Sequence, residues 1–244
     1  CMEMIPMLKR HGYRYVLVDS NYIEPQDDMS WEEMCYRPHY AKFDNEEIIV
    51  IVRDRELSDA QEAGMDWGWF SYEVNQRTKY CNFVPLVTTC TDGENGGWFR
   101  NTNEKSNFWQ YFYKEYMDKI RAGLCNIKPT FIDNYLDTYG VHGYVNVKTG
   151  AWNTGWHHGE GFVQWTGSEK QKNTLARIND LSRRFHELAV SDVKAIDPRD
   201  LENAYWRILR AETSCNIFWG EAWVHKCHED LDCAEEIINS AVHA

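Results

Sequence analysis

The sequence predicts an α/β fold in which a parallel sheet, or part of a barrel, is covered by helices and followed by a helical region. Three apolar runs rich in β-branched residues cover 13–19, 46–52 and 85–91. Helical patterns lie before the first run, between the second and third runs and after the third, an order typical of parallel strands covered by helices. From residue 168 onward the patterns are helical throughout. We therefore expect a sheet-containing region at 1–165 and a helical region at 166–244 that packs on it.

Cap, stop and turn signals predict the remaining elements of the first region. Residues 21–44 are polar and rich in turn-forming residues, which predicts a long loop. Ser58 and Gln61 have the spacing of a capping box, which predicts the start of a helix. A short strand is predicted at 144–147. The helices that these patterns predict cover 2–10, 58–77, 103–121 and 130–140.

The second region is predicted to hold three helices. Ser168 begins another capping-box pattern, and Asp197 is placed as an N-cap before a proline. The cluster His225-x-Cys227-His228 has fragments of zinc-ligand spacing but no second CxxC or HxxxH pair, so we expect it at a junction between two helices. The predicted helices cover 168–189, 198–223 and 230–241.

The composition excludes several classes of partner. The formal net charge is −12, from 26 Lys and Arg against 38 Asp and Glu, and no dense basic run occurs, so we expect no nucleic acid partner. No apolar window approaches the roughly 20 residues of a membrane-spanning helix, so we expect no membrane partner. The eight cysteines are scattered without CxxC spacing, which predicts reduced thiols in a cytoplasmic protein.

All three predicted strands end in ionisable residues. The first ends at Asp19, the second at Arg53-Asp54, and the third at Asp92-Gly93-Glu94 in a glycine-rich segment. Because the carboxyl ends of parallel strands meet at one edge of a sheet, we expect these side chains to lie on one rim. The alternatives are a helix N-cap or turn aspartate at Asp19 and Asp54, and a surface turn at Asp92.

Two carboxylates beside tryptophan-rich loops favour glycoside cleavage. One carboxyl protonates the leaving oxygen, and in retaining enzymes a second lies about 5–5.5 Å away and attacks. The chain has 11 Trp, 14 Tyr and 10 Phe, and aromatic faces stack on sugar rings, although we assign most of these residues to the core. Trp98, Trp152 and Trp156 stand in glycine-rich segments and are the predicted cleft walls.

A pair of histidines follows the last of these tryptophans. His157-His158 near Asp92 could instead bind a metal for hydrolysis. Adjacent side chains point in opposite directions on an extended backbone, so a chelating pair is awkward. We therefore favour a hydrogen bond from His157 to substrate, or a structural role, and expect no metal and no cofactor.

The segment 92–98 resembles the Asp-x-Glu-x-x-Gly motif of glycoside hydrolase family 57, whose members act on α-glucans as amylases, branching enzymes and 4-α-glucanotransferases. The resemblance implies an incomplete (β/α)7 barrel with parallel strands, with Asp92 as general acid/base and Glu94 at the second acidic position. The run 11–19 is similar to the strand that follows the nucleophile strand in this family. Trp152 and Trp156 lie where family members place aromatic residues that contact substrate.

The helical region also resembles this family. Residues 204–219 are similar to the helical motif that usually reads Glu-x-Ser-Asp-Trp, with Glu212 at its first position and Trp219 at the end of the segment. Cys215 and Asn216 stand in place of the Asp-Trp pair, which puts the substrate contacts of this motif in doubt. The resemblance also implies a nucleophilic Glu in a Trp-x-x-Glu motif before the first helix. No such motif precedes that helix, so we expect the 244 residues to be the C-terminal part of a longer protein and to hydrolyse little alone.

Together these observations predict a retaining glycoside hydrolase or glycosyl-transferring enzyme that acts on α-glucan or an oligosaccharide. Asp92 is the expected acid/base, Glu94 and Arg53 tune its charge at the substrate site, and the three tryptophans stack on sugars. Two alternatives remain: a non-catalytic carbohydrate-binding or regulatory protein, and a metal-dependent hydrolase similar to polysaccharide deacetylases. The sequence predicts neither the glucan linkage nor the oligomeric state.

Overall fold

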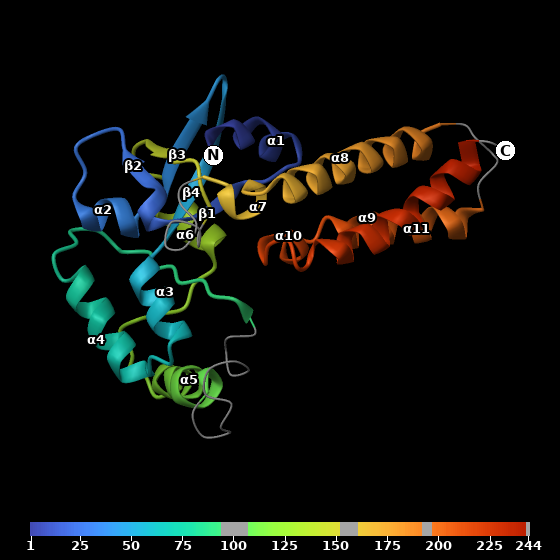
Figure 1. Cartoon of the computed structure of the whole chain (residues 1–244). Coiled ribbons are helices and arrows are strands. Elements are labelled where there is room, and N and C mark those ends of the chain that lie inside the picture. Colours follow the sequence, from blue (N-terminus) through green and yellow to red (C-terminus); the bar gives the residue numbers. More distant parts are fainter. Residues whose placement is uncertain (94–106, 152–160, 192–196, 243–244) are drawn as a thin grey trace. The chain divides into compact units, whose positions relative to one another are not determined.

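The computed structural model describes residues 1–93, 107–151, 161–191 and 197–242 (Figure 1). The chain divides into two compact units, Cys1–Trp152 and Asn153–Ala244. The sequence placed the boundary at 165/166, which falls inside helix α7 (Val163–Thr166). Gln164 of this helix donates a hydrogen bond to the carbonyl of Phe218 in the second unit. The first unit contains both strands and helices, and the described residues of the second form helices, as the sequence predicted.

A small mixed sheet forms the centre of the first unit. Strand β1 (Tyr15–Asp19) pairs in parallel with β4 (Glu46–Arg53), and β3 (His39–Phe43) pairs antiparallel with the other edge of β4. The register sets Asp19 opposite Arg53 at the carboxyl ends of the parallel pair. The α/β class is therefore confirmed, and the described residues form small sheets with one parallel strand pair.

The predicted third strand at 85–91 is not a strand in the structure. This segment is extended and joins the sheet through one parallel bridge, between Thr88 and Arg53. The amide of Asp54 also donates to the carbonyl of Thr88 at 2.8 Å. The β3–β4 hairpin occupies the rest of that edge of β4, so the segment at 85–91 reaches β4 only at its end.

The predicted long loop at 21–44 is wrong, because it contains regular structure. It holds strand β2 (Ile23–Pro25), helix α2 (Trp31–Tyr36) and strand β3. A complete capping box at Ser30 and Glu33 starts α2. Strand β2 pairs antiparallel with β5 (Val145–Val147), which confirms the short strand predicted there.

The predicted helix at 58–77 is two helices, α3 (Arg55–Glu62) and α4 (Trp67–Thr78). Gly64 lies between them with φ +101°, a conformation that favours glycine and ends the first helix. The capping-box prediction at Ser58 is also wrong, because the N-cap of α3 is Asp54, which accepts a hydrogen bond from the amide of Leu57.

The other helices of the first unit follow the predicted order. Helix α1 (Ile5–Arg10) begins after a 3₁₀ turn, and α6 (Ile132–Tyr139) ends at a glycine with positive φ. The helix predicted at 103–121 is described from residue 107 onward, as a π-helical turn η4 (Trp109–Lys114) that continues into α5 (Glu115–Arg121). Alternate residues of β4 join two cores, one with α1 and α2 and the other with α6.

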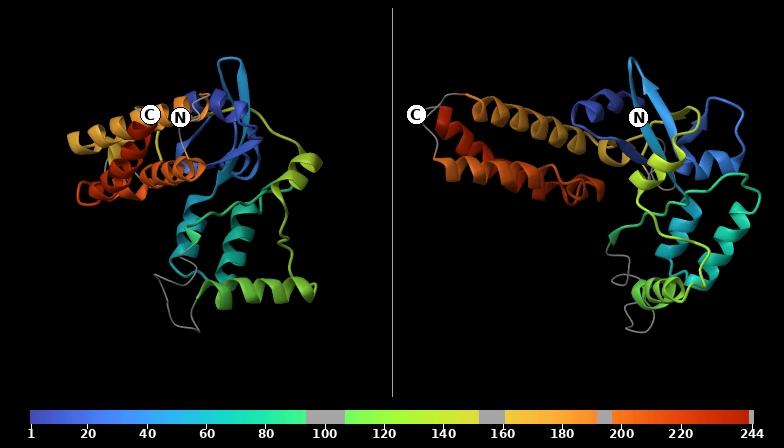
Figure 2. Two further views of the ribbon diagram at one scale, coloured as in Figure 1. Left: turned by 90° about the vertical axis from the view of Figure 1, so that its right-hand side faces the viewer. Right: turned by 180° about the vertical axis from the view of Figure 1, so that it is seen from behind.

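The second unit is a helical bundle in which α11 (Val224–Val242) packs against both α8 (Glu169–Ala189) and α9 (Pro198–Ala211) (Figure 2). The capping box at Ser168 and the N-cap at Asp197 are confirmed. Helix α9 ends at Ala211 rather than near 223, and a short helix α10 (Cys215–Phe218) follows it. No helix in the described part of the chain has the length and hydropathy of a membrane span.

The cluster at 225–228 lies within α11 rather than at a helix junction, so that prediction is wrong. Cys227 is buried in the core between α9 and α11. His228 is packed against α8, where its Nε2 lies 3.1 Å from Thr174 Oγ1 and its Nδ1 lies 2.9 Å from the guanidinium of Arg177. The two residues thus contribute to packing between helices.

Candidate functional site

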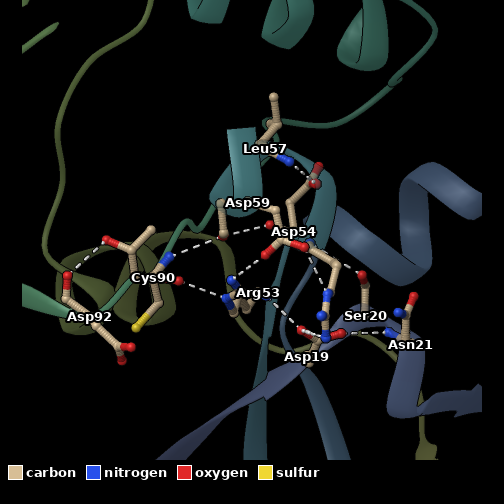
Figure 3. A network of polar contacts seen from close by, with 12 residues as sticks. Asp19, Ser20, Asn21, Arg53, Asp54, Leu57, Asp59, Cys90 and Asp92 are labelled. Atoms are coloured by element: carbon tan, nitrogen blue, oxygen red, sulfur yellow. Dashed lines mark hydrogen bonds and ion pairs between the residues drawn. The ribbon is translucent and has the colours of Figure 1, made fainter. Parts of the chain in front are cut away.

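The carboxyl ends of β1 and β4 and the extended segment at 88–92 meet at one edge of the sheet (Figure 3). The predicted gathering of ionisable side chains at this rim is therefore observed for the residues that the structure describes. Arg53, the last residue of β4, lies at the centre of the network. Its parallel partners are Asp19 on one side and Thr88 on the other.

The guanidinium of Arg53 joins three segments of the chain. Nη1 donates to Asp19 Oδ2 at 2.6 Å, Nη2 to Asp59 Oδ1 at 3.0 Å, and Nε to the carbonyl of Cys90 at 2.7 Å. The side chains of Arg53 and Asp19 are 4% and 1% exposed. A buried ion pair of this kind is stable only when hydrogen bonds satisfy both groups, and here they do.

A second arginine completes the charge balance. Arg55 on the first turn of α3 contacts Asp59 Oδ2 at 3.0 Å and Asp19 Oδ2 at 3.4 Å. The amide of Asn21 donates to the other oxygen of Asp19 at 3.0 Å. Two carboxylates and two guanidinium groups therefore neutralise one another at the rim.

Asp54 has a structural role at the same edge. Its Oδ1 caps α3, and its Oδ2 accepts a hydrogen bond from the hydroxyl of Tyr36 at 2.8 Å. Burial, followed by the nearby Asp54 carboxylate, raises the pKa of Tyr36. Asp19 likewise accepts from a backbone amide at the start of a 3₁₀ turn, Ser20–Tyr22. The N-cap alternative stated for both aspartates is thus the one observed.

Asp92 has an exposed side chain, as does Asp59, but Asp59 is held by two arginines. Figure 3 shows its carboxylate beyond Cys90 as viewed from Arg53. The carbonyl of Asp92 lies 3.5 Å from the hydroxyl of Thr91. Within the described residues, no arginine, lysine or amide hydrogen bonds to the Asp92 carboxylate, which leaves it accessible to solvent and to a ligand.

The other predicted site residues are either outside the described residues or in the second unit. Five of them lie outside the described residues: Glu94, Trp98, Trp152, Trp156 and His157. Glu212 is the exposed C-cap residue of α9. Trp219 is 61% exposed, and its ring packs edge-on against Phe218 with 4.9 Å between centroids. Their roles in binding substrate stay predictions.

Sequence reasoning missed several residues that build the rim. Arg55 and Asp59 form an (i, i+4) ion pair on α3, a spacing that could have been recognised in the sequence. Ser58 was interpreted as a helix cap, whereas its buried hydroxyl contacts the segment at 88–92. No three His, Cys, Asp or Glu side chains among the described residues are grouped so as to hold a metal ion.

Comparison with known proteins supports the resemblance found in the sequence. The fold and the rim together define an α/β protein that carries an exposed carboxylate at the carboxyl ends of its parallel strands. The profile of glycosyl hydrolase family 57 matches residues 2–137, more than half of the chain. The chain therefore belongs to glycosyl hydrolase family 57. A search of curated proteins gives no match.

Three solved structures share the fold. A GH57 branching enzyme from Thermococcus kodakaraensis, in complex with glucose and additives, aligns with a TM-score of 0.61 and 14% identity over 96% of this chain and 51% of its own. A 4-α-glucanotransferase from Thermococcus litoralis aligns with 0.53 and 17% identity over 96% and 38%. An exo-type maltose-forming amylase from Pyrococcus sp. ST04 aligns with 0.53 and 12% identity over 93% and 44%. The chain thus spans about half or less of the length of these proteins.

Proposed function

We propose that this chain forms part of a retaining glycoside hydrolase or glycosyl-transferring enzyme that acts on α-glucan, with Asp92 as its general acid/base. The observation that carries the proposal is the position of Asp92, exposed and two residues beyond a peptide that is held at the rim of the sheet. Family membership supports the reaction class, since the matched family is one of glycosyl hydrolases. The three aligned structures are a branching enzyme, a glucanotransferase and an amylase, which supports α-glucan as substrate.

A retaining reaction needs a second carboxylate about 5–5.5 Å from the acid/base. Asp19 and Asp59 are bound by arginines, and Asp54 caps a helix, so we assign none of them this task. We propose that the nucleophile comes from another segment of the protein, as the family resemblance implies. The parallel pair and the bridge at Thr88 are then part of an incomplete (β/α)7 barrel, to which that segment contributes further strands.

The remaining predicted residues have supporting roles in this proposal. Glu94 lies two residues after Asp92 and would tune its charge, while Trp98, Trp152 and Trp156 would stack on sugar rings and His157 would hydrogen-bond substrate. Glu212 and Trp219 would contribute to substrate binding from the helical region. For Arg53 we propose support of the rim, because its side chain is 4% exposed and its guanidinium binds three protein acceptors.

The test compares Asp92→Asn with Asp44→Asn in the full-length protein that contains this chain. Asp44 is exposed in the β3–β4 turn, at the opposite end of β4, so it receives the same chemical change far from the rim. We expect turnover of maltooligosaccharide to fall by about 10²–10⁴-fold in the first variant and to stay unchanged in the second. Normal turnover in Asp92→Asn contradicts the proposal, and glucan binding without turnover in the unaltered protein favours the non-catalytic alternative.

A further inference from the structure

The hydroxyl of Ser58 makes two hydrogen bonds whose direction is fixed. Ser58 lies in the first turns of α3 and is completely buried. Its hydroxyl donates to the carbonyl of Asp54 at 2.6 Å and accepts from the amide of Cys90 at 3.1 Å. A hydroxyl has one proton, so donation to Asp54 leaves its lone pairs for the Cys90 amide. The bond to Asp54 is common for serine in helices, whereas the bond to Cys90 links residues 32 positions apart.

Arg53 holds the same residue, Cys90, through its backbone carbonyl. The Nε of Arg53 donates to the carbonyl of Cys90 at 2.7 Å. Two residues earlier, the carbonyl of Thr88 accepts from the amide of Asp54 at 2.8 Å. Three hydrogen bonds therefore fix residues 88–90 against the junction of β4 and α3, and both polar groups of Cys90 are used.

This anchoring determines where Asp92 can lie. Two residues span at most about 7 Å of extended chain, so the position of Cys90 restricts that of Asp92 closely. The carboxylate of Asp92 has no hydrogen-bond partner among the described residues, where the Thr91 hydroxyl contacts the backbone carbonyl of Asp92 instead. We propose that Ser58 is a positioning residue, which holds the Cys90 peptide and thereby the Asp92 carboxylate in place for the reaction. The catalytic half of this inference rests on the proposed function, while the placing of residues 90–92 does not.

Amide hydrogen exchange tests the placing without any substrate. In Ser58→Ala we expect exchange of the Cys90 amide to rise by about two- to tenfold, because its hydrogen bond to Ser58 is lost. Ser58→Thr should retain protection, since the threonine hydroxyl can donate to the i−4 carbonyl and still accept from the Cys90 amide. Thr78→Val is the matched control: among the described residues, the hydroxyl that it removes bonds to the Val74 carbonyl of its own helix.

Kinetics test the consequence for the reaction. In the full-length protein, Ser58→Ala should lower kcat on maltooligosaccharide by roughly tenfold to a hundredfold with KM unchanged, whereas Thr78→Val should alter neither. Unchanged exchange of the Cys90 amide in Ser58→Ala overturns the inference, as does an equal rise throughout the first unit. Should Ser58→Ala fail to fold, exchange of the Cys90 amide in the unaltered protein tests the inference instead. A Cys90 amide that exchanges as fast as an unstructured amide overturns the inference. If Asp92→Asn retains turnover, the proposed function fails, and the exchange result still decides the placing of the segment.

Discussion

Replacement of Arg53 by methionine should destabilise the first unit severely. The change removes the guanidinium that neutralises Asp19, whose side chain is 1% exposed, and leaves this carboxylate with Arg55 at 3.4 Å and one backbone amide. Removing one partner of a buried ion pair costs about 3–5 kcal/mol. Domains are stable by only about 5–15 kcal/mol, so we expect a loss of roughly a fifth or more of the stability of this unit. Loss of the bond to Cys90 adds to the effect.

Native-state hydrogen exchange of the β1 and β4 amides measures this loss in the first unit alone. Arg14→Met is the control, because Arg14 also joins two aspartates, Asp133 and Asp137, but its side chain is 47% exposed and its loss should have little effect. Adding Asp19→Asn to Arg53→Met should restore part of the stability, since no unpaired charge then stays buried. An Arg53→Met variant as stable as Arg14→Met would refute the assignment of Arg53 as the centre of the rim.

Two further predictions concern titration and thiol reactivity. Burial, and then the nearby Arg177, lower the pKa of His228 from 6.5, so the unfolded chain binds more protons and the second unit should lose stability as pH falls below about 6.5. Exchange of the α8 and α11 amides at pH 7.5 and 5.5 should show this loss of stability. The loss should be smaller in His228→Gln and unchanged in the control His225→Gln, whose side chain is exposed. An equal loss in His228→Gln contradicts the reasoning. Burial also raises the pKa of the thiols of the two buried cysteines. Brief treatment with iodoacetamide followed by mass spectrometry should therefore modify the exposed cysteines and spare the buried ones. Early modification of the buried cysteines would count against the packing. The exposed cysteines are Cys90 and Cys215, and the buried ones are Cys35 and Cys227.

Local signals predicted the elements whose stability is local. Strand β4 was predicted correctly because its apolar run is long, and α8 because both of its capping-box bonds form between residues three apart. The division between α3 and α4 was also present in the sequence, as Gly64 followed by Asp66, but the apolar spacing of the two helices masked it. The β3–β4 hairpin was missed because its first residue, His39, is polar, and its burial depends on carbonyls of α2.

The candidate site could be predicted only in part. The strand-end acids and Arg53 were identified because residues at the ends of parallel strands must meet, and the structure brings them together. The separate roles of the acids depend on tertiary contacts: Asp19 is neutralised by arginines, Asp54 caps a helix, and Asp92 stays exposed. The role of Ser58 was hidden for the same reason, because its partner is 32 positions away.

The acid/base role of Asp92 is tested most directly by the leaving group of the substrate. The dinitrophenolate group of a dinitrophenyl maltoside leaves without protonation. The sugar that leaves a maltooligosaccharide instead needs a proton from the acid on its glycosidic oxygen. In the full-length protein, Asp92→Asn should therefore lower kcat/KM by about 10²–10⁴-fold on maltooligosaccharide and far less on the dinitrophenyl substrate. Equal losses on both substrates, or no loss on either, would contradict the account.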